Sequence, residues 1–173
     1  MHHTVVLLLL FLIKPAICAK DDSHPIPDSF VGTWIPSHDD NMEALLRKRG
    51  YGYSVGRILL SVTVKKKFEK TNSMFNVTLI TRGKHQSWVN VTTNDMFVAP
   101  YLDGMHYYFL FDRSEYGLLL QIFFMDSSKL KEAVMFEYVS PFLKMHIKYD
   151  NVKACIYHYK ETPDKHRDST IEM

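Results

Sequence analysis

The stretch PDSFVGTW (residues 27–34), followed shortly by NMEALLRKRGYGYSVGR (residues 41–57), decides how this chain folds. The first segment predicts a β-strand around Phe30–Pro36, since it is apolar and aromatic. The second predicts a helix over Asn41–Lys48 that stops at Gly50, because its apolar residues recur at helical spacing. Those apolar residues are Met42, Leu45 and Leu46.

A second short helix is expected after the Gly-Tyr-Gly break. Ser54 can cap this helix, which would run to about Leu60. Asp39 or Asp40 can cap the first helix. Helix pairs with a glycine turn also occur in DNA-binding proteins, but no basic recognition face follows here. The formal net charge is only +2, and the Lys65–Lys67 run is interpreted as a solvated strand end, so no nucleic-acid surface is expected.

From Val62 onward the chain consists of short runs rich in β-branched and aromatic residues, separated by turn signals such as Asp103-Gly104. About nine strands follow the helices at regular spacing, which predicts a sandwich or an up-and-down barrel. In the segment 142–149 apolar residues alternate with Lys144, His146 and Lys148, so one face of the sheet is apolar. Ten such strands closed into a barrel leave an interior too wide for side chains alone to fill, and its apolar lining predicts a hydrophobic ligand.

The two ends of the chain do not share the strand pattern of the region between them. An apolar run near the start is too short to span a membrane and is followed by small residues, which predicts a secretory signal cleaved after residue 18 or 19. The predicted organisation is a signal peptide at 1–19, a polar N-terminal lead at 20–28, a barrel domain at 29–160 and a mobile polar tail at 161–173. The expected location is extracellular.

Secretion has two consequences for the chain. The sequons at Asn76 and Asn90 become candidate glycosylation sites. Cleavage also leaves Cys155 as the one cysteine of the mature sequence, so the fold must rest on its hydrophobic core rather than on a disulfide. A content of 46% hydrophobic and 13% aromatic residues is compatible with such a core in a single domain.

Catalytic chemistry is not expected. The histidines show no H-x-x-x-H spacing, and no C-x-x-C pair occurs, so the sequence predicts no metal site. No pairing of a nucleophile with a base stands out. We therefore predict a protein that is not an enzyme and needs no cofactor.

The order of elements resembles the intracellular lipid-binding protein family, which includes the fatty-acid-binding proteins. The shared features are an F-x-G-x-W first strand, an Asn-led helix, a glycine break, a second helix and then hairpins. The signal-like start and the RGYG turn (residues 49–52) are most similar to the secreted fatty-acid-binding proteins of nematodes. NDMFVAPYLDG (residues 94–104) is also similar to a family strand that contains Phe and ends in Asp-Gly.

The resemblance covers about Pro27–Lys160 and implies an all-β fold. This fold is a ten-stranded antiparallel up-and-down β-barrel, or β-clam, with a two-helix lid between the first two strands. It implies that Leu59 and Leu60 are portal residues, with the turns near Arg82–Lys84 and Asp103-Gly104 opposite them. The alternative is that these leucines only seal the core. Lipocalins start similarly, but they carry their helix late and usually a disulfide.

The sequence departs from the family where a fatty-acid carboxylate is commonly held. The family uses Arg-x-Tyr on the last strand and a second Arg two strands earlier. Here Tyr159 matches the Tyr, but the Arg position carries Tyr157, or Ile156 if the register slips by one, and the second Arg position carries Phe136. A buried carboxylate without a partner costs several kcal/mol or takes up a proton. The acid could bind reversed, the ligand could be neutral, or the tyrosines could donate hydrogen bonds to it.

We therefore expect a monomeric, secreted carrier for transport or sequestration of a fatty acid, retinoid or other lipid, with transient membrane contact as an option. The candidate ligand-binding residues are Val134, Phe136, Tyr138, Met145, Tyr157 and Tyr159. The alternative is an interaction protein with no lipid cargo, whose barrel is filled by its own aromatic residues. These would be Phe109, Phe111, Phe123, Phe124 and Phe136.

Overall fold

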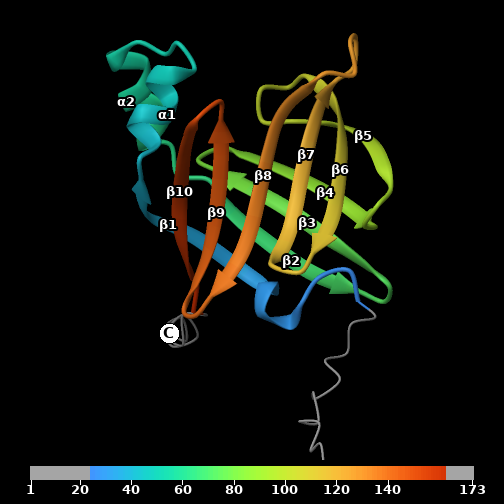
Figure 1. The fold of residues 1–173 in the computed structure, drawn as a ribbon. Coiled ribbons are helices and arrows are strands. Elements are labelled where there is room, and N and C mark those ends of the chain that lie inside the picture. Colours follow the sequence, from blue (N-terminus) through green and yellow to red (C-terminus); the bar gives the residue numbers. More distant parts are fainter. Residues whose placement is uncertain (1–23, 163–173) are drawn as a thin grey trace, which may run out of the picture.

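Ten antiparallel strands form one sheet that curls into a nearly closed barrel (Figure 1). The structure is a computed structural model and describes residues 24–162. The sheet order is β4-β3-β2-β1-β10-β9-β8-β7-β6-β5. The strands are β1 (Gly32–Asp40), β2 (Lys65–Thr71), β3 (Met74–Thr81), β4 (Lys84–Val91), β5 (Met96–Pro100), β6 (His106–Ser114), β7 (Gly117–Phe124), β8 (Leu130–Val139), β9 (Phe142–Tyr149) and β10 (Val152–Lys160). The predicted up-and-down barrel is confirmed.

Two helices lie between β1 and β2, at one end of the barrel (Figure 1). Helix α1 (Met42–Lys48) follows Asn41, which has a left-handed backbone, and the Asp39 carboxylate accepts a hydrogen bond of 3.3 Å from the Met42 amide. Asp39 is therefore the capping acid of the predicted pair. Neither helix is long and apolar enough to cross a membrane, and the same holds for every helix in residues 24–162.

Helix α2 (Tyr53–Ser61) begins earlier than predicted. Its N-cap is Gly52, whose extended backbone leads directly into the first turn, and Ser54 lies inside the helix. The prediction that Ser54 caps this helix is therefore wrong. The wider pattern holds, because both helices and the glycine-containing break lie where their spacing placed them.

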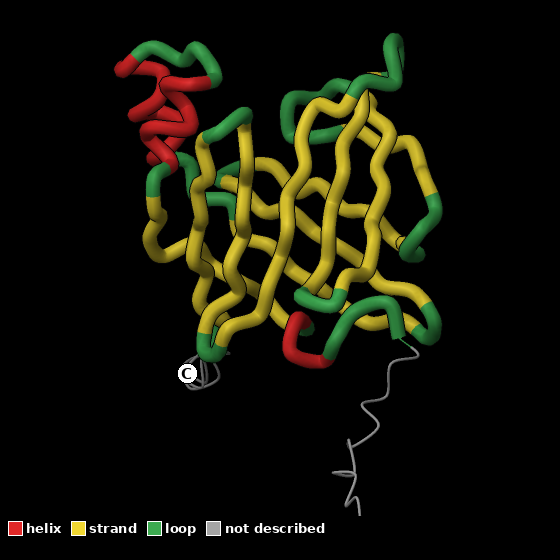
Figure 2. The backbone as a smooth tube through the Cα atoms, viewed as in Figure 1, coloured by secondary structure: helices red, strands yellow, loops and turns green. Residues whose placement is uncertain are grey.

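The N-terminal segment covers the opposite end of the barrel from the helices (Figure 2). It contains a short 3₁₀ helix, η1 (Asp28–Phe30), and β1 begins after it at Gly32 rather than at Phe30. Ile26 and Phe30 are fully buried, and the Trp34 indole donates a 2.7 Å hydrogen bond to the Phe30 carbonyl. The part of the polar lead that the structure describes thus contributes an apolar residue to the core.

The sheet ends, β4 and β5, are not hydrogen-bonded to each other as strands. Trp88 on β4 bridges this gap, because its indole donates a 3.2 Å hydrogen bond to the Pro100 carbonyl on β5. Its ring also lies 4.5 Å from the Phe109 ring and 6.2 Å from the Tyr101 ring. Side-chain packing therefore closes the barrel where the backbone ladder stops.

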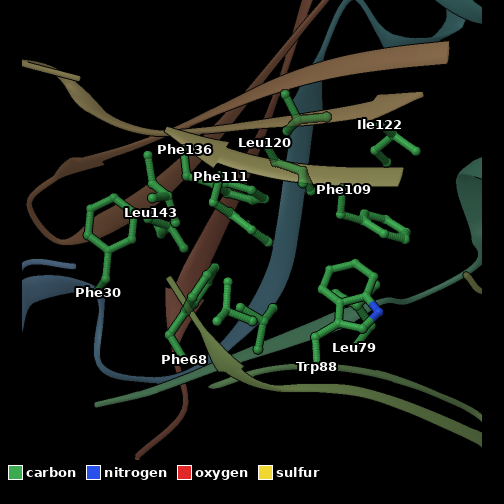
Figure 3. Close-up of a cluster of buried hydrophobic side chains, with 14 of the residues drawn as sticks. Phe30, Phe68, Leu79, Trp88, Phe109, Phe111, Leu120, Ile122, Phe136 and Leu143 are labelled. Atoms are coloured by element: carbon green, nitrogen blue, oxygen red, sulfur yellow. The ribbon is translucent and has the colours of Figure 1, made fainter. Parts of the chain in front are cut away.

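Aromatic side chains from opposite walls point toward one another in the core (Figure 3). Phe109, Phe111 and Phe136 are buried, as the filled-barrel alternative requires. Phe124 is 39% exposed and Phe123 is half-buried, so these two do not plug the lumen. The aromatic cluster consequently fills only part of the interior.

Candidate ligand-binding site

A cavity of about 340 Å³ remains inside the barrel. Its lining comes from strands on both walls, from the β5–β6 turn and from α2. Most lining residues are aliphatic or aromatic, and the ionisable ones are Lys66, Tyr101, Glu132 and His158. Ligand pockets generally measure about 300–1,000 Å³ and combine an apolar lining with a few polar groups. The cavity meets both conditions, at the small end of the range.

Three of the predicted ligand-binding residues line this cavity. Val134 and Phe136 project from β8, and Met145 projects from the neighbouring β9. The register pairs Phe136 with Met145, so the two side chains lie side by side on the wall. The face of the sheet that the sequence predicted as inward is therefore the one that lines the cavity.

The three predicted tyrosines do not line the cavity. His158 on β10 is fully buried, and since successive side chains of a strand alternate, its neighbours Tyr157 and Tyr159 point to the opposite face. The Tyr157 hydroxyl donates a 2.9 Å hydrogen bond to Asp40, and its ring stacks 4.3 Å from His38. Tyr159 is 45% exposed.

Tyr138 lies at the far end of β8, 39% exposed, with its ring 6.0 Å from that of Trp34. The inward positions of β10 are occupied by Ile156 and His158, both of which line the cavity. The last strand therefore has the slipped register that was left open above. This geometry does not support hydrogen bonds from the tyrosines to an enclosed ligand.

Lys66 is a polar residue whose side chain points inward, against the prediction of a solvated strand end. It lies in the Lys65–Lys67 run, interpreted as solvated, yet it is only 7% exposed and lines the cavity. The signal that would have located it is its phase: Lys66 is two residues from Phe68, which is fully buried, so both point inward.

Lys66 and His158 form a buried pair. The Lys66 ammonium lies 2.8 Å from His158 Nε2 and 3.3 Å from the Val64 carbonyl. His158 Nδ1 lies 3.2 Å from the Leu143 carbonyl, so Nδ1 carries the proton and Nε2 accepts from Lys66. Burial lowers the pKa of Lys66 to about 7. Burial, together with the Lys66 charge, lowers the pKa of His158 to about 3.

The helix pair meets the cavity mouth. Leu59 on α2 lines both the cavity and an adjoining surface hollow beside α1, whereas Leu60 packs against the core and lines the hollow but not the cavity. Val62 and Leu102 line both the cavity and a second hollow that reaches the β3–β4 turn at Arg82. The elements predicted to form a portal therefore lie near one another, with Leu59 on the cavity and Leu60 against the core, and their portal role stays a prediction.

An ion pair ties the helix pair to the barrel wall. Arg49, between the helices, donates a 2.9 Å hydrogen bond to Glu132 on β8, and both side chains are largely buried. The Arg49 guanidinium also lies 5.3 Å from the centre of the Tyr149 ring. Glu132 is the acidic residue on the cavity wall, and its charge is already matched by Arg49.

The described residues contain no arrangement that suggests a catalytic or metal site. Within residues 24–162 no three His, Cys, Asp or Glu side chains gather closely enough to hold a metal. The segment Gly52–Gly56 matches the G-x-S-x-G pattern of hydrolase nucleophile turns. That turn joins a strand to a helix, whereas Ser54 lies within exposed α2. Burial raises the pKa of the Cys155 thiol, the opposite of what a reactive cysteine needs.

Comparison with known proteins identifies the same architecture. No protein-family profile matches the chain. It is 31% identical over 101 residues to fatty acid-binding protein homolog 1 of Caenorhabditis elegans. The aligned region covers 57% of this chain and 60% of the relative. It is 26% identical over 123 residues to the fatty acid-binding protein homolog of Ascaris suum, covering 67% of this chain and 71% of the relative. The matched region thus spans less than two thirds of the Caenorhabditis elegans relative.

Solved structures agree on the fold. As-p18, an extracellular fatty acid binding protein, superposes with a TM-score of 0.72 at 22% identity, over 79% of this chain and 99% of that protein. A fatty acid binding protein of Schistosoma mansoni, in complex with arachidonic acid, superposes with a TM-score of 0.64 at 19% identity. The superposition covers 78% of this chain and 98% of that protein. These relatives are named as binding proteins, in agreement with the prediction that the chain is not an enzyme. The resemblance predicted from the sequence is confirmed: this chain has the fold of the fatty-acid-binding proteins and has homologues among those of nematodes.

Proposed function

We propose that this protein is a carrier that binds one fatty acid or similar lipid in the cavity of its barrel. The apolar cavity of about 340 Å³ is the observation that carries this proposal. The names of the relatives support it, and so does the arachidonic acid bound by the Schistosoma mansoni neighbour. Burial of an acyl chain contributes roughly 25 cal/mol per Å² of apolar surface, which is the main driving force expected here.

The lipid enters beneath α2. Leu59 and Val62 lie at the mouth of the cavity, and the β5–β6 turn contributes Leu102 on the other side. Movement of α2 away from this mouth would open a path without disturbing the strand ladder. The mechanism is reversible burial, with no bond made or broken in the ligand.

Secretion is part of the proposal. The predicted signal peptide at 1–19 lies outside the described residues, as does most of the predicted tail at 161–173. The apolar run at the start of the sequence and the extracellular character of As-p18 support an extracellular carrier. The domain at 29–160 would then be the mature binding unit.

A filled barrel without cargo is the second candidate. The contacts of Trp88, Phe109 and Phe111 favour it, because these side chains occupy part of the lumen. The carrier is preferred because the remaining space lies between the walls, is lined mainly by apolar side chains and is adjacent to the helix pair.

Titration of delipidated protein with a fluorescent fatty acid tests the two candidates. The carrier predicts saturable binding of one probe per chain. Ile156→Trp adds bulk inside the cavity and should weaken binding, whereas Tyr159→Trp adds bulk on the outer face of the same strand and should not. Absence of probe binding, together with no lipid in an organic extract of the purified protein, would favour the filled barrel.

A further inference from the structure

We propose that Lys66, held by His158, is the binding site for the carboxylate of an anionic lipid inside the barrel. This assignment rests on the proposed function, because it names the headgroup that the cavity accepts. It also answers the question left by the missing arginines: a cation is present in the lumen, but it comes from β2.

The fold brings the two residues together over one strand. Lys66 on β2 pairs with Trp34 of β1, and His158 on β10 pairs with Pro36 of the same strand. The two side chains reach across the inner face of β1 and meet at 2.8 Å. Because the Leu143 carbonyl fixes the His158 ring, the imidazole orients the ammonium toward the cavity that both residues line.

Lys66 has an unused hydrogen-bond donor. A protonated lysine carries three N–H groups. Two are accounted for by His158 Nε2 and the Val64 carbonyl, and no further acceptor is recorded for Lys66 among the described residues. With only 7% of its surface exposed, the side chain cannot satisfy the third group by reaching bulk water. A ligand carboxylate in the cavity would accept it.

The charges around the cavity favour an anion at this position. Glu132, the acidic residue on the wall, is paired with Arg49 at 2.9 Å, and Lys66 takes part in no recorded ion pair within residues 24–162. The other titratable groups that face the cavity are His158, whose Nε2 is an acceptor, and Tyr101, whose pKa is raised by burial. A carboxylate therefore meets one unmatched cation and no unmatched anion.

Binding should consequently be linked to protonation. Burial leaves Lys66 only partly charged near pH 7, and a carboxylate beside it favours the charged form. An anionic lipid should therefore bind with uptake of a proton from solution and should bind more weakly as the pH rises from 7 to 9. A neutral lipid of the same chain length does not need the charge and should show neither effect.

Calorimetric titration with oleic acid and oleyl alcohol tests the assignment. Lys66→Met should weaken oleic acid binding by about 10- to 100-fold, the range expected for loss of a hydrogen bond between charged groups, and leave oleyl alcohol unchanged. Lys67→Met is the matched control, since Lys67 lies in the same run but pairs with Glu69 on the outside. Lys66→Arg, which keeps the charge, should retain part of the preference for the acid.

The wild-type protein supplies a second readout that needs no variant. Oleic acid titrated at pH 8 in two buffers of different ionisation enthalpy should reveal proton uptake. Affinity that is the same at pH 7 and pH 9, without proton uptake, would overturn the headgroup assignment, as would an unchanged affinity of Lys66→Met for oleic acid. If the wild type binds neither lipid, the proposed carrier function itself fails.

Discussion

Lys66 loses its proton at a much lower pH in the folded protein than in the unfolded chain, and this difference makes stability depend on pH. Its folded pKa is about 7, against an ordinary value of 10.5. Between these values the unfolded state binds more protons, so the contribution of Lys66 to the free energy of unfolding rises with pH across this window. At lower pH Lys66 is charged in both states, so the burial of its charge lowers the free energy of unfolding by the full amount.

Lys66→Met should therefore stabilise the ligand-free protein at pH 6.5, by roughly 1–4 kcal/mol, because removing the buried charge outweighs the cost of leaving His158 Nε2 without its hydrogen-bond donor. The gain should shrink toward pH 8.5. Urea unfolding of the wild type and the variant at both pH values measures it, with Lys67→Met as the control. A variant less stable than the wild type at pH 6.5 would contradict this account.

His158 makes stability depend on pH in a second range, below pH 6.5. Its folded pKa is about 3, against 6.5 ordinarily, so the unfolded chain takes up this proton first as the pH falls. The wild type should lose stability from pH 6.5 downward, by up to about 1.4 kcal/mol per pH unit from this group. His158→Gln should lose less over pH 6.5–4.5 in urea unfolding, whereas His106→Gln, at an exposed strand position, should follow the wild type. Parallel curves for all three proteins would show that His158 is not the group responsible.

The residues that carry this chemistry were only partly predictable. Met145 was found because β9 alternates between apolar and polar residues, and Val134 and Phe136 because they share a face of β8 opposite to Glu137. The last strand, VKACIYHYK, has apolar or aromatic residues in both phases, so alternation alone could not show whether Tyr157 or His158 faces inward. Lys66 was missed because a charge run suggests solvent, although its phase with Phe68 indicates the interior.

At the scale of elements, the two helices differ in how firmly they are held. Helix α1 buries Met42, Leu45 and Leu46, whereas the buried residue of α2 is Gly56. Most of the apolar side chains of α2 are exposed, with Tyr53 at 71% and Ile58 at 63%, and Leu60 is the one that packs partly against the core. Few buried contacts mean a low local free energy of opening, so α2 is the element expected to move when a ligand enters.

Gly56→Ala should strengthen α2 without altering its packing. An added Cβ meets no atom within 4 Å, and alanine favours a helix over glycine by about 1 kcal/mol. Amide hydrogen exchange in α2 should slow by about fivefold, and the bound fluorescent fatty acid should dissociate more slowly. Gly50→Ala is the opposite control: the backbone φ of Gly50 is +88°, which strains alanine and should loosen the helix pair. Slower exchange in α2 with unchanged ligand dissociation would place the gate elsewhere.

At the scale of the whole molecule, the sequence was sufficient to predict the architecture. The F-x-G-x-W strand, the helix pair and the succession of hairpins predict ten antiparallel strands in chain order, as observed. The contribution of the N-terminal segment was not predictable, because Ile26 is one apolar residue between two prolines. Its burial depends on the open barrel end, which exists only once the strands are assembled.

The two sequons lie next to each other on the outside of this barrel, and the fold predicts unequal use. Asn90 is exposed at an irregularity of the β3–β4 ladder, with a backbone φ of +55°. Asn76 is half-buried, and its carboxamide oxygen accepts a 2.9 Å hydrogen bond from the Asn90 amide, which holds the Asn76 side chain against the sheet.

Protein secreted from a eukaryotic host should therefore carry its glycan mainly on Asn90. Intact mass before and after glycosidase treatment measures this: Asn90→Gln should remove most of the glycan mass and Asn76→Gln little. Secreted protein that carries its glycan mainly on Asn76, or none at all, would contradict the prediction. The same mass locates the N-terminus, which a cleaved signal places after residue 18 or 19.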